Sequence, residues 1–160
     1  MIDNADAVKL LDSKRDGAIF VATMNANNVH FGLPTVTSNE KLDFPVSGAM
    51  SKAGDVALGL ALAQPDRKIL CLDGDGSLLM NLGAMVTISN KAPKNLVHVL
   101  FNNNVYAVTG GQPIPGSEQV DWEDMAKSAG YAKVFSFDNL EDMTNGIDEA
   151  LSAVGPVFVH

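Results

Sequence analysis

The sequence predicts one α/β domain of three layers, in which a largely parallel sheet is covered by helices on both faces. Short apolar runs alternate along the chain with segments of helical periodicity, and this alternation is typical of parallel sheets. Two of these runs, at residues 68–73 and 96–101, are separated by one insert of helix length, as in a βαβ unit. The 160 residues are 46% hydrophobic and contain no linker-like stretch, so we expect a single domain over residues 1–160.

The first half of the chain is expected to contain, in order, a helix at 3–15, a strand at 18–22, an amide-rich loop at 23–30, a turn region at 44–50 and a helix at 51–63. Ala7, Val8 and Leu11 recur at helical spacing, which supports the first helix. The helix at 51–63 is rich in small residues. Gly54 and Gly59 lower its intrinsic propensity, so this helix must depend on close packing.

The second half is expected to contain a strand at 68–73, a helix at 78–90, a strand at 96–101, a long loop at 106–119, a helix at 121–130, a strand at 133–137, a helix at 141–154 and a strand at 156–160. The helix at 78–90 is apolar on most sides, so we expect it to be covered on most sides. A loop as long as 106–119 is more often functional than idle.

Composition restricts the classes of partner. The net charge of −8 disfavours nucleic acid and anionic membrane surfaces, because both reward a basic patch. The N-terminus is acidic without a signal-peptide core, and no apolar stretch reaches membrane-spanning length, so we expect a cytoplasmic protein that binds neither nucleic acid nor membrane. The single Cys71, together with His98, Met80 and Met85, is interpreted as structural.

Two polar clusters stand where strands end. Gly74, Asp75, Gly76 and Ser77 follow the apolar run at 68–73, and the amide pair Asn102–Asn103 follows the run at 96–101. If the two strands are parallel neighbours, both clusters lie on the edge where open α/β sheets bind ligands. The glycines allow tight turns, and Asp75 and Asn103 offer the hard oxygen ligands that suit Mg²⁺. No Lys or Arg lies between Lys68 and Lys91, so a metal rather than a lysine would hold a phosphate there.

These residues resemble the diphosphate-binding domain of the thiamine diphosphate enzymes, whose motif is Gly-Asp-Gly followed after a crossover by a pair ending in Asn. Gly48-Ala49-Met50 is similar to the family's Gly-Ser/Ala-Met/Ile turn, and Asp121–Tyr131 is similar to its later Asp-aromatic to Gly-Tyr helix. Within the family, the stretches 78–83, 92–96 and 109–112 look most like sulfopyruvate decarboxylase β subunit and phosphonopyruvate decarboxylase. The resemblance implies the thiamine diphosphate-binding fold.

The resemblance also implies site residues. Asp75, the Asn103 side-chain oxygen and the Val105 carbonyl would bind Mg²⁺. Cofactor-binding positions would be Asn25, Gly48, Met50, Gly74, Gly76, Ser77, Asn103, Val105 and Tyr106. Met50 would be the apolar wedge under the bent cofactor or an ordinary core residue. Thr109 would lie near the substrate, and His30 is either a substrate contact and proton donor or a solvent-exposed loop histidine.

The implied activity is decarboxylation of a small 2-oxo acid with release of CO2 and an aldehyde. In this family a glutamate on a separate pyrimidine-binding domain activates the cofactor, and the chain is filled by one domain. The resemblance therefore implies an α-type partner subunit that supplies this glutamate, in a hetero-oligomer with paired copies. Two alternatives are a carboligase of acetolactate synthase type and a non-catalytic cofactor-binding or scaffolding subunit.

Overall fold

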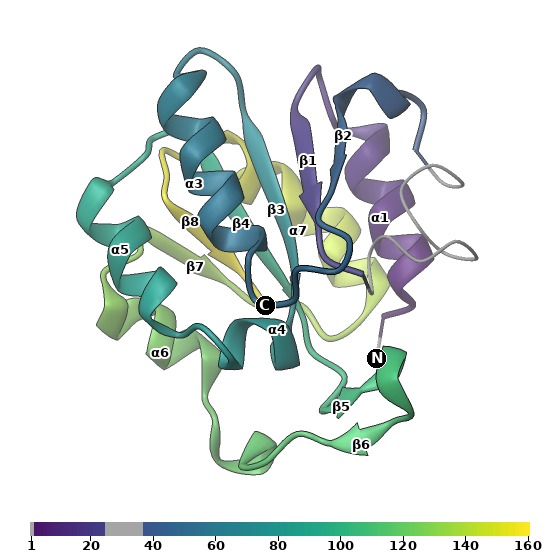
Figure 1. Cartoon of the computed structure of the whole chain (residues 1–160). Coiled ribbons are helices and arrows are strands. Elements are labelled where there is room, and N and C mark those ends of the chain that lie inside the picture. The colour runs from purple at the N-terminus through teal and green to yellow at the C-terminus, as the bar shows by residue number, and fades with distance from the viewer. Residues whose placement is uncertain (1, 25–36) are drawn as a thin grey trace.

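The computed structural model describes residues 2–24 and 37–160, and Figure 1 shows a sheet enclosed between two layers of helices. The sheet has six parallel strands in the order β2-β1-β3-β4-β8-β7. Their bounds are β1 Ile19–Ala22, β2 Asp43–Pro45, β3 Ile69–Gly74, β4 Leu96–Phe101, β7 Lys133–Phe135 and β8 Val157–Val159. The predicted parallel sheet with helices on both faces is confirmed.

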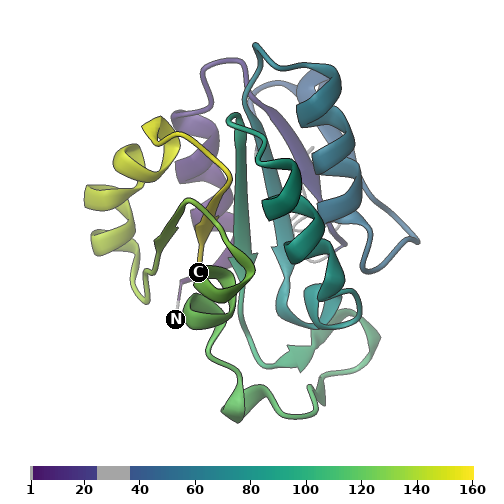
Figure 2. The same ribbon diagram turned by 90° about the vertical axis from the view of Figure 1, so that its left-hand side faces the viewer.

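The helices divide between the two faces of the sheet, which Figure 2 shows on edge. Helices α1 (Asn4–Ser13) and α7 (Leu140–Ser152) cover one face, and α3 (Ala53–Ala63), α5 (Gly83–Lys91) and α6 (Trp122–Ala129) cover the other. A short helix, α4 (Asp75–Leu79), begins directly where β3 ends. Single 3₁₀ turns occur at η1 (Glu40–Leu42), η2 (Ala107–Thr109) and η3 (Ser117–Gln119).

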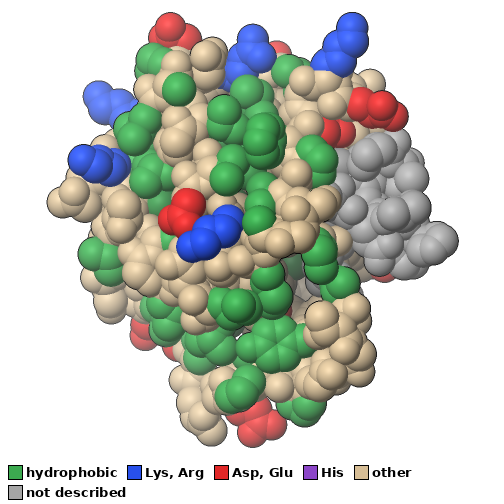
Figure 3. Space-filling view, in the orientation of Figure 1, with side chains coloured by type: hydrophobic (Ala, Val, Ile, Leu, Met, Phe, Trp, Pro, Cys, Tyr) green, Lys and Arg blue, Asp and Glu red, His purple; other side chains and the backbone are tan. Residues whose placement is uncertain are grey.

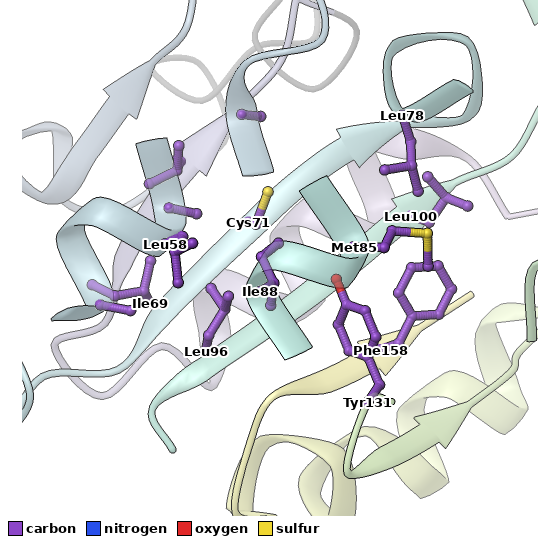
Figure 4. Close-up of a cluster of buried hydrophobic side chains, with 14 of the residues drawn as sticks. Leu58, Ile69, Cys71, Leu78, Met85, Ile88, Leu96, Leu100, Tyr131 and Phe158 are labelled. Atoms are coloured by element: carbon purple, nitrogen blue, oxygen red, sulfur yellow. The ribbon is translucent and has the colours of Figure 1, made fainter. Parts of the chain in front are cut away.

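Each face of the sheet has its own hydrophobic core. The α1–α7 side buries Leu11, Phe20 and Ile147 completely, while Figure 4 shows the other core, where Ile88 and Phe158 are also fully buried. Burying one such side chain contributes about 1.5–3 kcal/mol relative to leaving it exposed. These two clusters hold the central strands in position, and thereby hold the residues at the strand ends.

Strands β3 and β4 are parallel neighbours, as the βαβ pattern predicted. Their register pairs Ile69 with Leu96 at one end and Gly74 with Phe101 at the other. Because both strands end at the same level, the Gly74–Ser77 turn and the Asn102–Asn103 pair come side by side. The prediction that these two polar clusters meet at one edge is confirmed.

The predicted helix at 78–90 is wrong in its bounds, because two helices occupy this region. Helix α4 ends at Leu79 and α5 begins at Gly83. Between them, Asn81 donates its side-chain amide to the carbonyl of Ser51 at 3.2 Å and to the carboxylate of Asp55 at 2.9 Å. Met80 and Leu82 keep right-handed helical dihedral angles, but the backbone bonds here join residues three apart, from Asn81 to Leu78 and from Ala84 to Asn81, so the regular α-helix is interrupted. Met80, interpreted as a core residue, lies at this break and is 60% exposed, whereas Met85 is buried.

Two other segments are more regular than the sequence indicated. The turn region expected at 44–50 overlaps the edge strand β2, whose Pro45 is tolerated because an edge strand leaves one side of its backbone unpaired. The expected loop at 106–119 contains β6 (Gln112–Pro113), which pairs antiparallel with β5 (Val105–Tyr106). Gly110 and Gly111 have φ values of +120° and +76° and make the turn between them.

A buried arginine joins α1 to β2. Arg15 lies 2.5 Å from Asp43 and 3.3 Å from Asp12, and its guanidinium stands 4.0 Å from the ring centroid of Phe20. The side chains of Arg15 and Asp43 are 4% and 3% exposed. This long-range ion pair explains why a three-residue strand without a strong local signal is held at the sheet edge.

The expectations for the buried Cys71 and His98 and for the glycines of α3 can be compared with the structure. Cys71 and His98 are fully buried, as their interpretation as structural residues predicted. Gly54 of α3 lies close to Ile88 and His98, so the expected close packing is present there, whereas Gly59 faces open space. Within residues 2–24 and 37–160, no helix combines the length and the apolar character needed to cross a lipid bilayer.

Candidate functional site

The site lies at the carboxyl ends of β1 and β3, in front of the β5–β6 hairpin. A small cavity of about 60 Å³ opens there between the strand ends, the turn at Met50 and the hairpin. Its lining residues are Thr23, Met24, Met50, Gly74, Asp75, Gly76, Ser77, Val105, Tyr106, Ala107, Val108 and Thr109. Most of these side chains are apolar, so the polar groups of Asp75, Ser77 and Thr23 act in surroundings with little water.

Asp75 is the charged group at the centre of this site. One carboxylate oxygen accepts the N–H of Gly76 at 2.8 Å, and the other accepts the N–H groups of Asn103 at 3.1 Å and Asn104 at 2.7 Å. Asp75 is 4% exposed, and this burial raises the pKa of its carboxyl above the usual value, although the three N–H groups act to lower it. The carboxylate therefore connects the end of β3 with the segment after β4.

Asn103 complements Asp75 with an amide oxygen. Its side-chain oxygen accepts the N–H of Val105 at 3.1 Å, which folds the chain back immediately after β4. Asn104 has a φ of +61°, a left-handed conformation that Asn tolerates better than most residues. Asp75 and Asn103 each carry side-chain oxygen atoms of the hard type that Mg²⁺ prefers, and the Asn103 N–H joins the two residues.

Gly76 is required by the close approach of Tyr106. A Cβ atom at position 76 would lie 2.6 Å and 2.7 Å from two carbons of the Tyr106 ring and 3.2 Å from Ile114. The hairpin thus packs directly against the backbone of the Gly74–Ser77 turn. A side chain larger than hydrogen at this position would displace Tyr106 and with it the hairpin wall of the cavity.

The turn before α3 forms another wall and is bonded to the same turn. The N–H of Ser51 donates to the Ser77 hydroxyl oxygen at 3.1 Å. Gly48 and Ser51 have φ values of +70° and +77°, so the chain bends sharply on both sides of Met50. Met50 is half-buried and lines the cavity. Of its two earlier interpretations, the structure favours a side chain that faces the site over an ordinary core residue.

The structure brings together most of the residues that the sequence singled out. Lining the cavity are Met50, Gly74, Asp75, Gly76, Ser77, Val105, Tyr106 and Thr109. Asn103 binds Asp75 from beside the cavity, and Gly48 lies in the turn without lining it. Thr109 is exposed, and its hydroxyl lies 3.3 Å from the side-chain oxygen of Gln112. Asn25 and His30 lie outside the described residues.

Sequence reasoning missed Thr23, Asn104 and Val108. Thr23 follows β1 and is 5% exposed, yet its hydroxyl has no hydrogen-bond partner within the described ranges. A buried hydroxyl of this kind facing a cavity is available to a ligand. Its position directly after a predicted strand was a usable signal. No local sequence pattern indicated Val108. Its exposed side chain lines the cavity because the β5–β6 hairpin places it there.

Both members of the amide pair, Asn102 and Asn103, line a second and larger cavity of about 260 Å³ on the α1–α7 side of the sheet. The side-chain nitrogen of Asn102 lies 3.2 Å from Nε2 of His160 there. This cavity contains none of the residues of the Gly74–Ser77 turn. Asp75 and Val105 line the smaller cavity, and Asn103 lies between the two cavities with its N–H bonded to Asp75, so we assign the site by its chemistry rather than by its volume.

Residues 21–160 match the protein family described as thiamine pyrophosphate enzyme, C-terminal TPP binding domain. The chain is 36% identical to a phosphonopyruvate decarboxylase of Streptomyces viridochromogenes over 94% of its own length and 36% of that protein. It is 41% identical to a sulfopyruvate decarboxylase subunit beta of Methanothermobacter thermautotrophicus over 73% of its length and 60% of that protein. The chain thus spans between about a third and three fifths of these relatives.

Solved structures show the same fold. A thiamine diphosphate-dependent 4-hydroxybenzoylformate decarboxylase of Rhodococcus jostii RHA1 superposes with a TM-score of 0.77 at 24% sequence identity. The superposition covers 98% of this chain and 32% of that protein.

Proposed function

This chain belongs to the thiamine pyrophosphate enzymes as their C-terminal TPP-binding domain, and from this membership we propose that it is the diphosphate-binding subunit of a heteromeric, Mg²⁺-dependent 2-oxo acid decarboxylase. The observation that supports the proposal most directly is the contact of Asp75 with the backbone of Asn103 and Asn104. These N–H groups bind the carboxylate at the edge where this fold class binds ligands, next to the residue whose amide oxygen is the second proposed ligand.

The residues present fit the cofactor. Asp75, the Asn103 side-chain oxygen and the Val105 carbonyl form an all-oxygen donor set that would hold Mg²⁺, which usually takes few protein ligands beside phosphate and water. Gly76 and Ser77 would bind the diphosphate. The buried hydroxyl of Thr23 beside Gly74, which has no partner among the residues the structure describes, adds a further polar group that a ligand could satisfy.

Other residues would hold the organic part of the cofactor. Met50 would support the bent molecule from below, and the carbonyl of Gly48 would accept its amino group. Asn25 and Tyr106 complete the proposed binding set. Thiamine diphosphate, when bound, supplies the electron sink that allows CO2 to leave a 2-oxo acid. The apolar side chains of Met24, Met50 and Val108 would exclude water around it, which strengthens electrostatic interactions within the site.

The substrate is proposed to be a small 2-oxo acid whose tail carries no strong negative charge. None of the described residues that line the cavity is Lys or Arg. An arginine is the natural partner for a phosphonate or sulfonate group, and the chain has no Lys or Arg between Arg15 and Lys41 or between Lys94 and Lys127. Thr109, and His30 if it faces the site, would be the polar groups that this chain contributes near the substrate.

A partner subunit is proposed to complete the site. No glutamate occurs among the described residues that line the cavity, so the acid that activates the cofactor would come from an α-type, pyrimidine-binding subunit. Val108 and Met80 are 49% and 60% exposed, and Figure 3 shows apolar side chains gathered on the part of this face where Figure 1 places α4 and the hairpin. One relative is itself named a subunit beta. We propose a hetero-oligomer with paired copies.

The test is to purify the chain with its co-purifying partner and measure CO2 release from 2-oxo acids with Mg²⁺ and thiamine diphosphate. We expect activity in the complex, little in the chain alone, and its loss in Asp75→Ala. A mixed product formed with a second carbonyl compound would identify a carboligase instead. If Asp75→Ala left the function of the complex intact, the chain would be a scaffolding subunit and the proposal would be wrong.

A further inference from the structure

Three buried polar side chains lie beside the core on the α3–α5–α6 side of the sheet, where His98 and Tyr131 pack against Phe158; Figure 4 labels Tyr131 and Phe158. His98, Asp73 and Tyr131 are 0%, 2% and 7% exposed. The Tyr131 hydroxyl lies 2.8 Å from Nδ1 of His98, and Nε2 of His98 lies 3.4 Å from one carboxylate oxygen of Asp73. The other oxygen of Asp73 accepts the N–H of Gly74 at 2.9 Å. Four residues are thus linked from the end of α6 to the start of the turn.

The direction of these hydrogen bonds follows from Tyr131. Burial raises the pKa of its phenol well above the ordinary value, so the hydroxyl keeps its proton. Among the described residues its partner is Nδ1 of His98, and we infer that the O–H donates and Nδ1 accepts. A neutral imidazole that accepts at Nδ1 carries its proton on Nε2. Nε2–H therefore points to Asp73, whose carboxylate accepts from both sides.

The cluster of Cys71, Asp73 and His98 could alternatively be interpreted as a metal centre. The Sγ atom of Cys71 and the ligand atoms of Asp73 and His98 lie within 4.8 Å of one another, a spacing suited to a bound ion. In the hydrogen-bond direction above, however, Nε2 has no free lone pair. Burial, and then the carboxylates of Asp73 and Asp55, raise the pKa of the Cys71 thiol. The contacts therefore favour a hydrogen-bonded chain.

We propose that Asp73, held by His98 and Tyr131, is a positioning residue for the diphosphate and metal anchor. Asp73 binds the N–H of Gly74 and so orients the peptide that leads into Asp75 and Gly76. Because Asp75 in turn receives backbone N–H groups from the segment after β4, a change in this peptide alters both sides of the anchor. This inference rests on the proposed function for its ligand, although the hydrogen-bond chain itself does not.

Asp73→Asn tests the hydrogen-bond chain without changing the volume of the side chain. An asparagine that keeps its oxygen on the Gly74 N–H turns its NH2 toward Nε2 of His98, so the ring must move its proton to Nδ1. Selective ¹⁵N-histidine NMR of the purified protein should show the Nε2–H tautomer of His98 in the wild type and the Nδ1–H tautomer in Asp73→Asn. His98→Gln assigns the resonance. If His98 of the wild type carried its proton on Nδ1, or if the purified protein contained stoichiometric metal, the inferred hydrogen-bond chain would be wrong.

Affinity for Mg²⁺ and thiamine diphosphate, measured calorimetrically on the complex with the co-purifying partner where every variant is folded, tests the positioning role. We expect Asp73→Asn to weaken binding by about tenfold or more, as substitution of a supporting residue commonly does. Tyr131→Phe removes only the hydroxyl and keeps the ring against Phe158, at 5.4 Å between centroids, so it should move the Nδ1 resonance of His98 and weaken binding less. Ile147→Val, in the core on the opposite face of the sheet, should lower stability and leave binding unchanged.

The outcomes separate this inference from the proposed function. If the wild type does not bind the cofactor even in the complex with its co-purifying partner, the proposed function fails. The tautomer change, with the shift of the Gly74 and Gly76 amide resonances, then still tests the hydrogen-bond chain. If the wild type binds and Asp73→Asn binds equally well, Asp73 is structural and the positioning role is wrong. Equal weakening by Ile147→Val would also overturn it, because the effect would then follow stability alone.

Discussion

The backbone N–H of Ser51 donates a hydrogen bond of 3.1 Å to the side-chain oxygen of Ser77. This bond joins the turn at Met50 to the Gly74–Ser77 turn, two segments that lie on different sides of the proposed cofactor site. Ser51 makes it from a left-handed conformation with a φ of +77°, in which a side chain is strained. The wall of the site is therefore held at some conformational cost.

Replacement of Ser51 by glycine should stabilise the protein. The substitution relieves the left-handed strain, keeps the N–H that Ser77 accepts, and adds only the greater flexibility of glycine in the unfolded chain. We expect a net gain of about 0.5–1 kcal/mol, or roughly 1–4 °C in Tm. Thermal unfolding followed by circular dichroism checks it. Ser51→Ala is the matched control, since it keeps the strain and should give no gain.

Substitution of Gly76 by alanine should disrupt the site. The new methyl would have to displace the Tyr106 ring, so we expect a loss of about 1–3 kcal/mol in stability and weaker cofactor binding. Chemical denaturation and calorimetry measure the two effects. Gly59→Ala in α3 meets open space and should stabilise by about 0.5–1 kcal/mol. A Gly76→Ala variant with unchanged unfolding and binding would mean that Tyr106 does not rest on Gly76.

Asp75 should make stability depend on pH with a definite sign. Burial raises its folded pKa above the unfolded value of about 4, so the folded chain holds this proton more tightly. Its contribution to the free energy of unfolding is greatest below the unfolded pKa and falls as pH rises through the folded pKa. Urea unfolding of the wild type without Mg²⁺, compared with Asp75→Asn at each pH, isolates this group.

Mg²⁺ should reverse that dependence, because the ion binds the ionised carboxylate. Stabilisation by Mg²⁺ and diphosphate is expected to grow as pH rises above the folded pKa of Asp75 and to vanish in Asp75→Asn. Stabilisation that is equal in both proteins would place the ion elsewhere.

Removal of the Arg15 side chain should be strongly destabilising. Arg15→Met leaves the carboxylates of Asp12 and Asp43 buried without their cation, which should cost about 3–5 kcal/mol. Urea denaturation measures the loss. Lys9 pairs with Asp6 on the surface, and Lys9→Met should cost at most about 1 kcal/mol. Arg15→Met/Asp43→Asn should recover part of the loss, and a double variant less stable than Arg15→Met would show that Asp43 is held by other groups.

The fold was predictable where local pattern and tertiary role agree. The apolar runs of β3 and β4 are long enough to be recognised, and one helical insert implies that they are parallel. Strand β2 was missed because it has three residues and includes Pro45, and the Arg15–Asp43 ion pair that holds it joins distant segments. The break between α4 and α5 was missed for a similar reason, since Asn81 binds Ser51 and Asp55 across the fold.

The type of site was predictable from the sequence, because of the family resemblance and because of the types of residue at the ends of two strands. By itself the sequence determined that Asp75 and Asn103 would meet, because residues following parallel neighbouring strands share one edge of the sheet. Only the tertiary structure decided that Tyr106 packs on Gly76, that the Thr23 hydroxyl lines the cavity without a partner among the described residues, and that Asp73 binds His98. These contacts depend on strand order and side-chain direction, both of which are fixed when the two hydrophobic cores pack. They produce no periodic pattern in the sequence.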